Sequence, residues 1–239
     1  SKLFGVTFHR LADAPVWHED VMPYSMHMDG KEVGRFFLDM HPRANKYKHA
    51  AVFPVQHGTI GGPRPVATMV CNFPKPVDAN NPGLMEHTQV VTFFHEFGHL
   101  IHHLLGRNTK WVNMSGFYVE WDFVEAPSQL LEEWAWDPDV LAGFAHHHKT
   151  SEPIAKDLVV RMRAANEFGK GVHVMRQLFY TAYSFFMHNR DPANLDLDQY
   201  SEEIFKGYSP YRNIPETYVY SNFGHLIGYS SMYYTYQWS

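Results

Sequence analysis

The sequence predicts an α+β fold that is predominantly α-helical, with a small antiparallel sheet in the N-terminal third followed by helices. Two observations support this prediction. Apolar residues alternate with a period of two up to about residue 76, and the period changes to that of an amphipathic helix from residue 84 onward. At 239 residues, with 45% hydrophobic content, we expect one domain over residues 1–239, divided into a strand-rich part (1–76) and a helical part (84–239).

Segments in the first third have the alternating, β-branched and aromatic character of strands. Asp29-Gly30 lies between two of these segments and is typical of the tight turn of a β-hairpin, because both residues tolerate positive φ. Pro54 cannot donate a backbone hydrogen bond, so we expect its strand at the sheet edge or at a bulge. The predicted strands cover residues 3–9, 25–28, 32–39, 50–55 and 66–73.

The helical part begins after a connection rich in Pro, Asn and Gly. A long amphipathic pattern covers residues 84–105, and Gly106 is typical of the residue that follows a helix C-terminus. A second helix is predicted near Asp122, because Asp122 and Glu125 have capping-box spacing and Pro127 is tolerated only near a helix start. Further helices are predicted at about 151–168, 171–188 and 196–206, with Gly169 and Gly207 ending two of them.

Composition limits the classes of partner that we expect. A net charge of -5 and a pI near 6.4 argue against nucleic acid or an anionic membrane, and no apolar run approaches the roughly 20 residues that span a bilayer. Cys71 is the only cysteine, so we expect no internal disulfide, which fits a reducing compartment. We expect a cytoplasmic location, and we expect Cys71 to be a small buried hydrophobe. The chain begins at Ser1 without Met and ends inside an aromatic run, so we expect a piece of a longer protein.

The predicted helix over residues 84–105 contains His95-Glu96-Phe97-Gly98-His99, an instance of His-Glu-x-x-His. Positions i and i+4 share a helix face, so His95 and His99 can bind one metal ion while Glu96 reaches a water on that ion. This combination is typical of a zinc hydrolase, and we predict one bound Zn²⁺. Because the chain contains 17 histidines, the pattern can also arise by chance, in roughly 5% of such chains.

A catalytic zinc ion usually has three protein ligands and one open position, so another element should supply a third ligand. Glu125 is our choice, because its neighbours are apolar and its carboxylate would be costly to bury without a cation. From the residues alone, an equally good interpretation is that Glu125 caps a helix by bonding back to Asp122. His102 and His103 are expected to be satisfied histidines near a helix end. The remaining candidates are Cys71, Glu120, Asp122, Glu132, Glu133 and the exposed run His146–His148.

Seven segments of the sequence match the sequence pattern of one known family, and they occur in the same order as in that family. They cover residues 38–43, 46–50, 72–76, 95–102, 115–116, 122–129 and 223–238. Together they make the sequence resemble the thimet oligopeptidase family of zinc metallopeptidases, which includes neurolysin, bacterial oligopeptidase A and bacterial dipeptidyl carboxypeptidase. The resemblance implies a zincin-like catalytic core, cut from enzymes that are much longer than this chain.

The resemblance also implies roles for individual residues. Glu96 is the implied general base, and His225, Tyr233 and Tyr236 are implied to line the cleft and steady the tetrahedral intermediate. The implied zinc ligands are His95, His99 and Glu125. From the residues alone, the tyrosine-rich segment would instead be an aromatic core stripe. Candidates for orienting the ligands are Ser128, Gln129 and Glu132.

The implied activity is hydrolysis of internal bonds in short peptides, or removal of C-terminal dipeptides, by water that a zinc ion activates. The expected partner is therefore a peptide substrate. The alternative from another class is a truncated fragment that binds zinc and peptides with little or no turnover, because the missing part of the longer enzymes would form one wall of the cleft.

Overall fold

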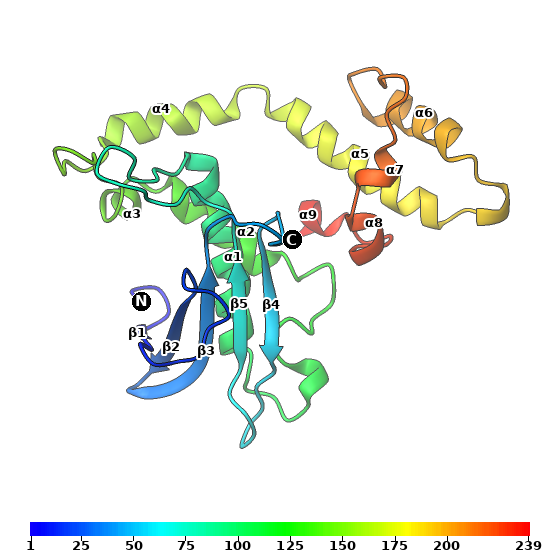
Figure 1. Ribbon diagram of the computed structural model, residues 1–239. Helices are drawn as coiled ribbons and strands as arrows, with labels where there is room; N and C mark the ends of the chain where they lie inside the picture. The colour runs from blue at the N-terminus through cyan, green and yellow to red at the C-terminus, as the bar shows by residue number, and fades with distance from the viewer. The chain divides into compact units, whose positions relative to one another are not determined.

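The computed structural model describes residues 1–239 and forms two compact units (Figure 1). The first unit holds residues 1–119 and 126–159, and the second holds residues 120–125 and 160–239. Strands lie only in the first unit, whereas helices occur in both, so the α+β class is confirmed. None of the helices is both long and apolar enough to span a bilayer.

The first unit is built on a five-stranded sheet with the order β1-β2-β3-β5-β4. Its strands are β1 (Val6–Arg10), β2 (Met22–Met28), β3 (Lys31–Asp39), β4 (Ala51–Gln56) and β5 (Val66–Val70), so each predicted segment forms a strand. The prediction of an antiparallel sheet is wrong for one pair, because β3 and β5 are parallel. The chain leaves β3, forms β4 at the outer edge, and turns back as β5 between the two, which makes the sheet mixed.

Two local predictions for the sheet are confirmed. The β2–β3 hairpin turns at Asp29 and Gly30, which have φ values of 50° and 72°, as a tight turn with positive φ at both central positions requires. Pro54 lies in the edge strand β4, where the pairing with β5 shifts register between Pro54 and Gln56. The missing N–H of Pro54 is therefore accommodated at an edge and an irregularity.

Helix α1 (His87–Leu105) covers one face of the sheet and completes the core of the first unit (Figure 1). Leu100, Ile101 and Leu104 of this helix pack against buried side chains of β2, β3 and β5. The helix starts three residues later than the predicted Leu84, because Glu86 acts as the N-cap and forms a capping box with Gln89. Cys71 is fully buried in the same core, which confirms it as a small buried hydrophobe.

Helix α2 (Ala126–Glu132) packs along α1. It starts four residues after the predicted Asp122, because residues 121–125 form turns, and Pro127 lies in its first turn as expected. Gly98 permits the close approach of the two helices. A Cβ atom at this position would lie 2.6 Å from both the Pro127 oxygen and the Ser128 Cα. Gly98 is therefore a packing requirement of the helix pair.

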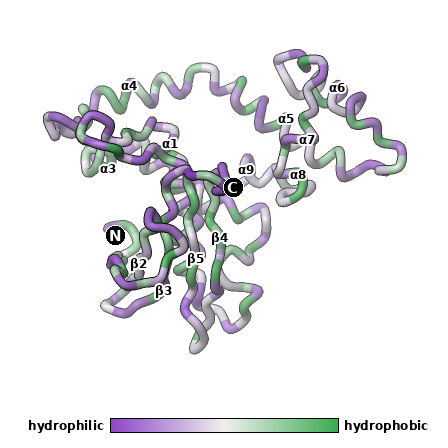
Figure 2. The backbone as a smooth tube through the Cα atoms, in the orientation of Figure 1, coloured by the Kyte–Doolittle hydropathy of each residue, from purple (hydrophilic) through white to green (hydrophobic).

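Most remaining elements are helices. Gly169, with φ of 73°, separates the two long helices α4 and α5 as predicted, whereas Gly207 lies inside α6 instead of ending it. Hydrophilic and hydrophobic stretches alternate along α4 and α5 (Figure 2). The α-helices are α3 (Pro138–Ala142), α4 (Lys156–Glu167), α5 (Lys170–His188), α6 (Leu197–Tyr208), α7 (Val219–Asn222), α8 (His225–Gly228) and α9 (Thr235–Trp238). Single 3₁₀ turns cover Val112–Met114, Glu133–Trp136 and Pro192–Asn194.

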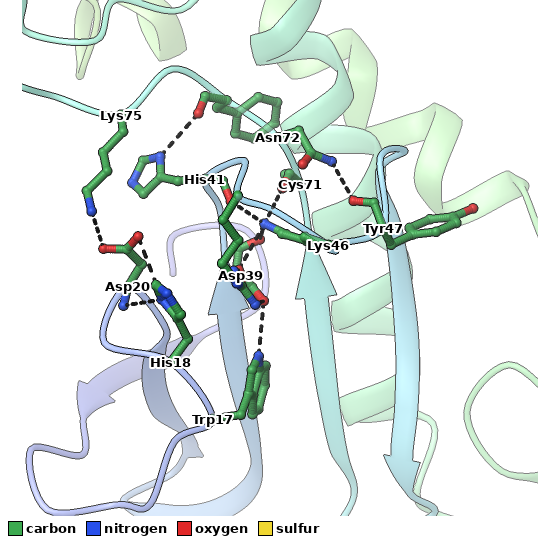
Figure 3. A network of polar contacts seen from close by, with 12 residues as sticks. Trp17, His18, Asp20, Asp39, His41, Lys46, Tyr47, Cys71, Asn72 and Lys75 are labelled. Atoms are coloured by element: carbon green, nitrogen blue, oxygen red, sulfur yellow. Dashed lines mark hydrogen bonds and ion pairs between the residues drawn. The ribbon is translucent and has the colours of Figure 1, made fainter.

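A buried polar network ties the ends of β3 and β5 together (Figure 3). The Asp39 carboxylate accepts hydrogen bonds from Arg43 at 2.6 and 2.8 Å and from the Trp17 indole at 3.1 Å. The Lys46 ammonium lies 2.9 Å from the same carboxylate and also donates to backbone carbonyls. These carbonyls belong to Asp39, His41 and Cys71.

We predict that Asp39→Asn lowers the free energy of unfolding by about 3 kcal/mol at pH 7, because it leaves Lys46 buried without its counterion. Burial favours the neutral acid, but the hydrogen bonds from Arg43, Lys46 and Trp17 outweigh it and hold the Asp39 pKa well below its usual range. The stabilisation is therefore complete above the unfolded-state pKa of about 3.9 and is lost as the pH falls toward the folded-state pKa.

Denaturant unfolding of both proteins between pH 7 and pH 3 measures this difference. Asp13→Asn changes an exposed carboxylate and serves as the control. If the difference in the free energy of unfolding between the parent and the Asp39→Asn variant stayed constant down to pH 3, the stabilisation by Asp39 would not be ionic.

We predict that Gly98→Ala destabilises the first unit by several kcal/mol, because the new methyl group would overlap backbone atoms of α2. Gly171→Ala in α5 is the matched control: its Cβ would meet nothing within 4 Å, and alanine favours the helix by about 1 kcal/mol. Thermal unfolding followed by circular dichroism compares the two variants. Equal melting temperatures would show that the helices do not need this glycine.

Candidate metal centre

The structure brings together the three side chains that the sequence analysis proposed as zinc ligands. His95, His99 and Glu125 each offer one ligand atom, and these atoms all lie within 4.8 Å of one another. Both histidines lie on α1, and Glu125 immediately precedes α2, the helix that packs against α1. Two imidazoles and a fully buried carboxylate form a donor set that suits Zn²⁺.

Glu132 is the partner that orients the first histidine. Its carboxylate Oε1 lies 2.7 Å from His95 Nδ1. This contact fixes the ring so that Nε2 is available to a metal, as is usual for a zinc-bound histidine. Glu132 is one of the three candidates that the sequence analysis names for this role, and it is the last residue of α2. The rings of His95 and His99 have centroids 5.0 Å apart.

Glu96, which lies between His95 and His99 in the sequence of α1, is buried. Its charge acts on Cys71, whose pKa rises to about 12, mainly through burial and secondarily through the Glu96 carboxylate. Cys71 is therefore a neutral thiol at neutral pH, and it offers no thiolate to a metal. Glu96 is the one acidic residue of α1.

Two further histidines of α1, His102 and His103, lie outside the candidate ligand group, and His103 is only partly satisfied, because its Nδ1 is buried without a hydrogen-bond partner. His103 is fully buried, and its Nε2 lies 3.1 Å from the Gln56 carbonyl, to which it donates. Burial lowers the pKa of His103, so the ring is neutral near pH 7. Burial also lowers the pKa of His102, with a smaller effect from His99. The run His146–His148 is exposed, as expected, but it lies beside a β-bridge and not at a helix end.

The aromatic residues proposed to line the cleft form one cluster in the second unit. His225 lies 5.4 Å from Tyr233 and 5.8 Å from Tyr236, measured between ring centroids. The Tyr233 hydroxyl donates a hydrogen bond of 2.9 Å to Gln177 of α5, and burial raises the pKa of Tyr233 to about 12. Tyr233 is therefore a neutral hydrogen-bond donor throughout the physiological range.

Tyr229 contacts the candidate ligand Glu125, a contact that the sequence analysis does not predict. Its hydroxyl donates a 2.6 Å hydrogen bond to Oε1 of Glu125. Burial raises the pKa of Tyr236, as do the charge of Glu125 and hydrogen bonds to Tyr229 and Glu125. The hydroxyls of Tyr229 and Tyr236 therefore both hydrogen-bond to Glu125, the candidate metal ligand. The tyrosine-rich segment is visible in the sequence. Its residues do not indicate which tyrosine contacts a carboxylate 104 positions away.

Two histidines and a buried glutamate within reach of one ion form a candidate metal centre, and comparisons with known proteins identify the family of the chain. The family model for peptidase family M3 matches residues 1–239. The chain is 38% identical over 251 residues to a thimet-like oligopeptidase of Dictyostelium discoideum, covering all of this chain and 37% of that protein. It is 34% identical over 248 residues to oligopeptidase A of Escherichia coli K12, covering all of this chain and 36% of that protein.

A dipeptidyl carboxypeptidase of Escherichia coli K12 is 32% identical over 246 residues, with all of this chain and 36% of that protein covered. The chain therefore belongs to peptidase family M3, as the resemblance to the thimet oligopeptidase family predicted. It spans little more than a third of the length of these relatives.

We predict that Glu132→Gln weakens Zn²⁺ binding by about 10- to 100-fold, because the amide is a poorer acceptor for the His95 ring N–H. Glu133→Gln changes the neighbouring exposed carboxylate and should leave the affinity unchanged. Competition with a chromophoric chelator gives both dissociation constants. Parent-like affinity in the Glu132→Gln protein would remove Glu132 from the site.

Proposed function

We propose that the chain is the catalytic core of a zinc-dependent peptidase of family M3, with the zincin-like arrangement that the family resemblance implies. The observation that carries the proposal is the fully buried Glu125 carboxylate, whose oxygen lies within 4.8 Å of ligand atoms on His95 and His99. Zn²⁺ would be held by these three side chains. When bound, it would polarise the scissile carbonyl and lower the pKa of a bound water toward neutrality.

Glu96 is the proposed general base. It follows the first ligand on α1 and precedes the second by three residues, so it belongs to the same turn of the helix as the metal site. Its carboxylate would accept a proton from the attacking water and deliver that proton to the leaving amine. The neighbouring thiol of Cys71 stays neutral, so it does not compete as a nucleophile.

The aromatic cluster would supply hydrogen bonds to the oxyanion and to the substrate backbone. Tyr233 and Tyr236 have raised pKa values, so each hydroxyl keeps its proton at neutral pH. His225 contacts both rings and would position them. One donor of this kind is typically worth about 3 kcal/mol in the transition state. In the structure the Tyr233 hydroxyl donates to Gln177, so substrate would have to replace that acceptor.

The proposed substrates are short peptides cut at internal bonds. The names of the relatives include both oligopeptidases and dipeptidyl carboxypeptidases, so removal of C-terminal dipeptides is the second form of the same chemistry. A zinc-binding fragment that holds peptides without turnover is the alternative function, because the chain spans only 37% of its Dictyostelium relative. A cytoplasmic location remains our prediction.

We predict that Glu96→Gln retains stoichiometric zinc and loses cleavage of an internally quenched peptide by at least about 10³-fold, because no base takes the proton from water. His99→Ala should lose stoichiometric zinc together with activity. Zinc content by atomic absorption and initial cleavage rates, with and without chelator, provide the two measurements.

The same assay separates the proposals. A parent protein that binds one zinc ion and a peptide but does not cleave it would establish the binding fragment instead. Activity that survives Glu96→Gln in a metal-clean preparation would exclude Glu96 as the base, and unchanged zinc content in His99→Ala would overturn the ligand set. Mass analysis of products distinguishes internal cleavage from release of dipeptides.

A further inference from the structure

Two histidines meet on the face of the sheet that points away from α1. His9 on β1 and His27 on β2 have ring centroids 4.6 Å apart, with ring planes at 65°. Their chain neighbours Phe8 and Met26 pack into the core against the helix side of the sheet. Because side chains alternate along a strand, both histidines lie on the opposite face, where His9 is exposed and His27 is half-buried.

The spacing of the two rings is that of a pair of metal ligands. Two imidazoles on one ion, at metal–nitrogen distances of about 2.1 Å and in cis positions, place their ring centroids roughly 4.5–5.2 Å apart. The observed 4.6 Å falls in this range. It is also close to the 5.0 Å between the rings of His95 and His99, the candidate zinc ligands.

Each ring is held by a hydroxyl two positions earlier on its own strand. Nε2 of His9 lies 3.2 Å from Thr7 Oγ1, and Nε2 of His27 lies 3.1 Å from Ser25 Oγ. When Nε2 carries the proton and donates to the hydroxyl, the lone pair of Nδ1 is left for a metal. A metal-binding histidine is usually oriented by such a bond from its second nitrogen to an oxygen. The repeated arrangement positions both rings before any ion arrives.

The charged side chains beside the two histidines belong to Glu32, Arg35 and Arg64. Strand β3 runs beside β2 and places Glu32 opposite His27 and Arg35 opposite Ser25. Glu32 pairs with Arg35 at 2.9 Å and with Arg64 at 3.4 Å, so one carboxylate faces two guanidinium groups and no uncompensated negative charge attracts a cation. Affinity would therefore come from the two imidazoles, with water completing the coordination shell. Such a donor set suits Cu²⁺, Ni²⁺ or Zn²⁺ and does not suit Mg²⁺ or Ca²⁺.

We propose that His9 and His27 form a second site for a divalent transition-metal ion, on the outer face of the sheet and distinct from the His95–His99–Glu125 centre. The site is bidentate and open, so it binds more weakly than a centre with three protein ligands. Its occupancy depends only on residues of β1 and β2, and it is independent of the function proposed for the other centre.

Cu²⁺–iminodiacetate is a suitable probe, because the chelate leaves cis positions that two neighbouring imidazoles can fill. The full chain is first loaded with one equivalent of Zn²⁺ to fill the other centre. We expect one equivalent of the probe to bind, with two imidazole nitrogens in its electron paramagnetic resonance spectrum. His27→Ala should lower the affinity by at least about tenfold and leave one imidazole nitrogen. Thr7→Val should lower the affinity by about tenfold while keeping both nitrogens.

His148→Ala tests the competing exposed pair His147 and His148, whose ring centroids lie 5.2 Å apart and so have ligand spacing too. It should leave affinity and stoichiometry unchanged. Parent-like binding by both His27→Ala and Thr7→Val, or loss of the probe only in His148→Ala, would overturn the proposal. Thermal unfolding verifies that each variant is folded, and Thr7→Val preserves the test if His27→Ala is not.

Discussion

The candidate site depends on the close approach of α1 and α2 at Gly98. The backbone of Pro127 and Ser128 occupies the space that any side chain at position 98 would fill. Because the helices touch there, the residue just before α2, Glu125, is buried within 4.8 Å of ligand atoms on the two histidines of α1. A glycine in the middle of a helix costs about 1 kcal/mol relative to alanine, so its presence in His-Glu-Phe-Gly-His reflects packing and not helix propensity.

Burial of Glu125 in turn organises the aromatic residues of the second unit. A carboxylate removed from water needs hydrogen bonds or a cation, and Tyr229 supplies a 2.6 Å bond from an element more than a hundred residues away. Tyr236 hydrogen-bonds to the same carboxylate and to Tyr229. The buried Glu125 carboxylate therefore accepts hydrogen bonds from two hydroxyls of the tyrosine-rich segment, those of Tyr229 and Tyr236. The Tyr233 hydroxyl donates its hydrogen bond to Gln177 instead, so its acceptor differs from that of Tyr229 and Tyr236.

Features that depend on neighbouring residues could be predicted from the sequence. Asp29-Gly30 and Pro54 specify their turn and edge position locally, and the helix with His95 and His99 is long and strongly periodic. The parallel pairing of β3 and β5 could not be predicted, because alternation has a period of two in either direction. Short helices such as α7 and α8 have four residues each, too few for periodicity. The contact of Tyr229 with Glu125 depends on tertiary packing alone.

The histidines of this chain differ in the hydrogen-bond partner of one ring nitrogen and in the access of a metal to the other nitrogen. His95 pairs its Nδ1 with the Glu132 carboxylate, which leaves Nε2 to face the ligand group. His103 bonds the Gln56 carbonyl through Nε2, but a Cβ on Gly116 would lie 2.4 Å from its Nδ1, so backbone covers the remaining lone pair. The hydroxyls of Thr7 and Ser25 contact Nε2 of His9 and His27, so Nδ1 is the nitrogen that would bind a metal at the site we propose. Access to that second nitrogen, more than the number of histidines, therefore decides which of them can hold a metal.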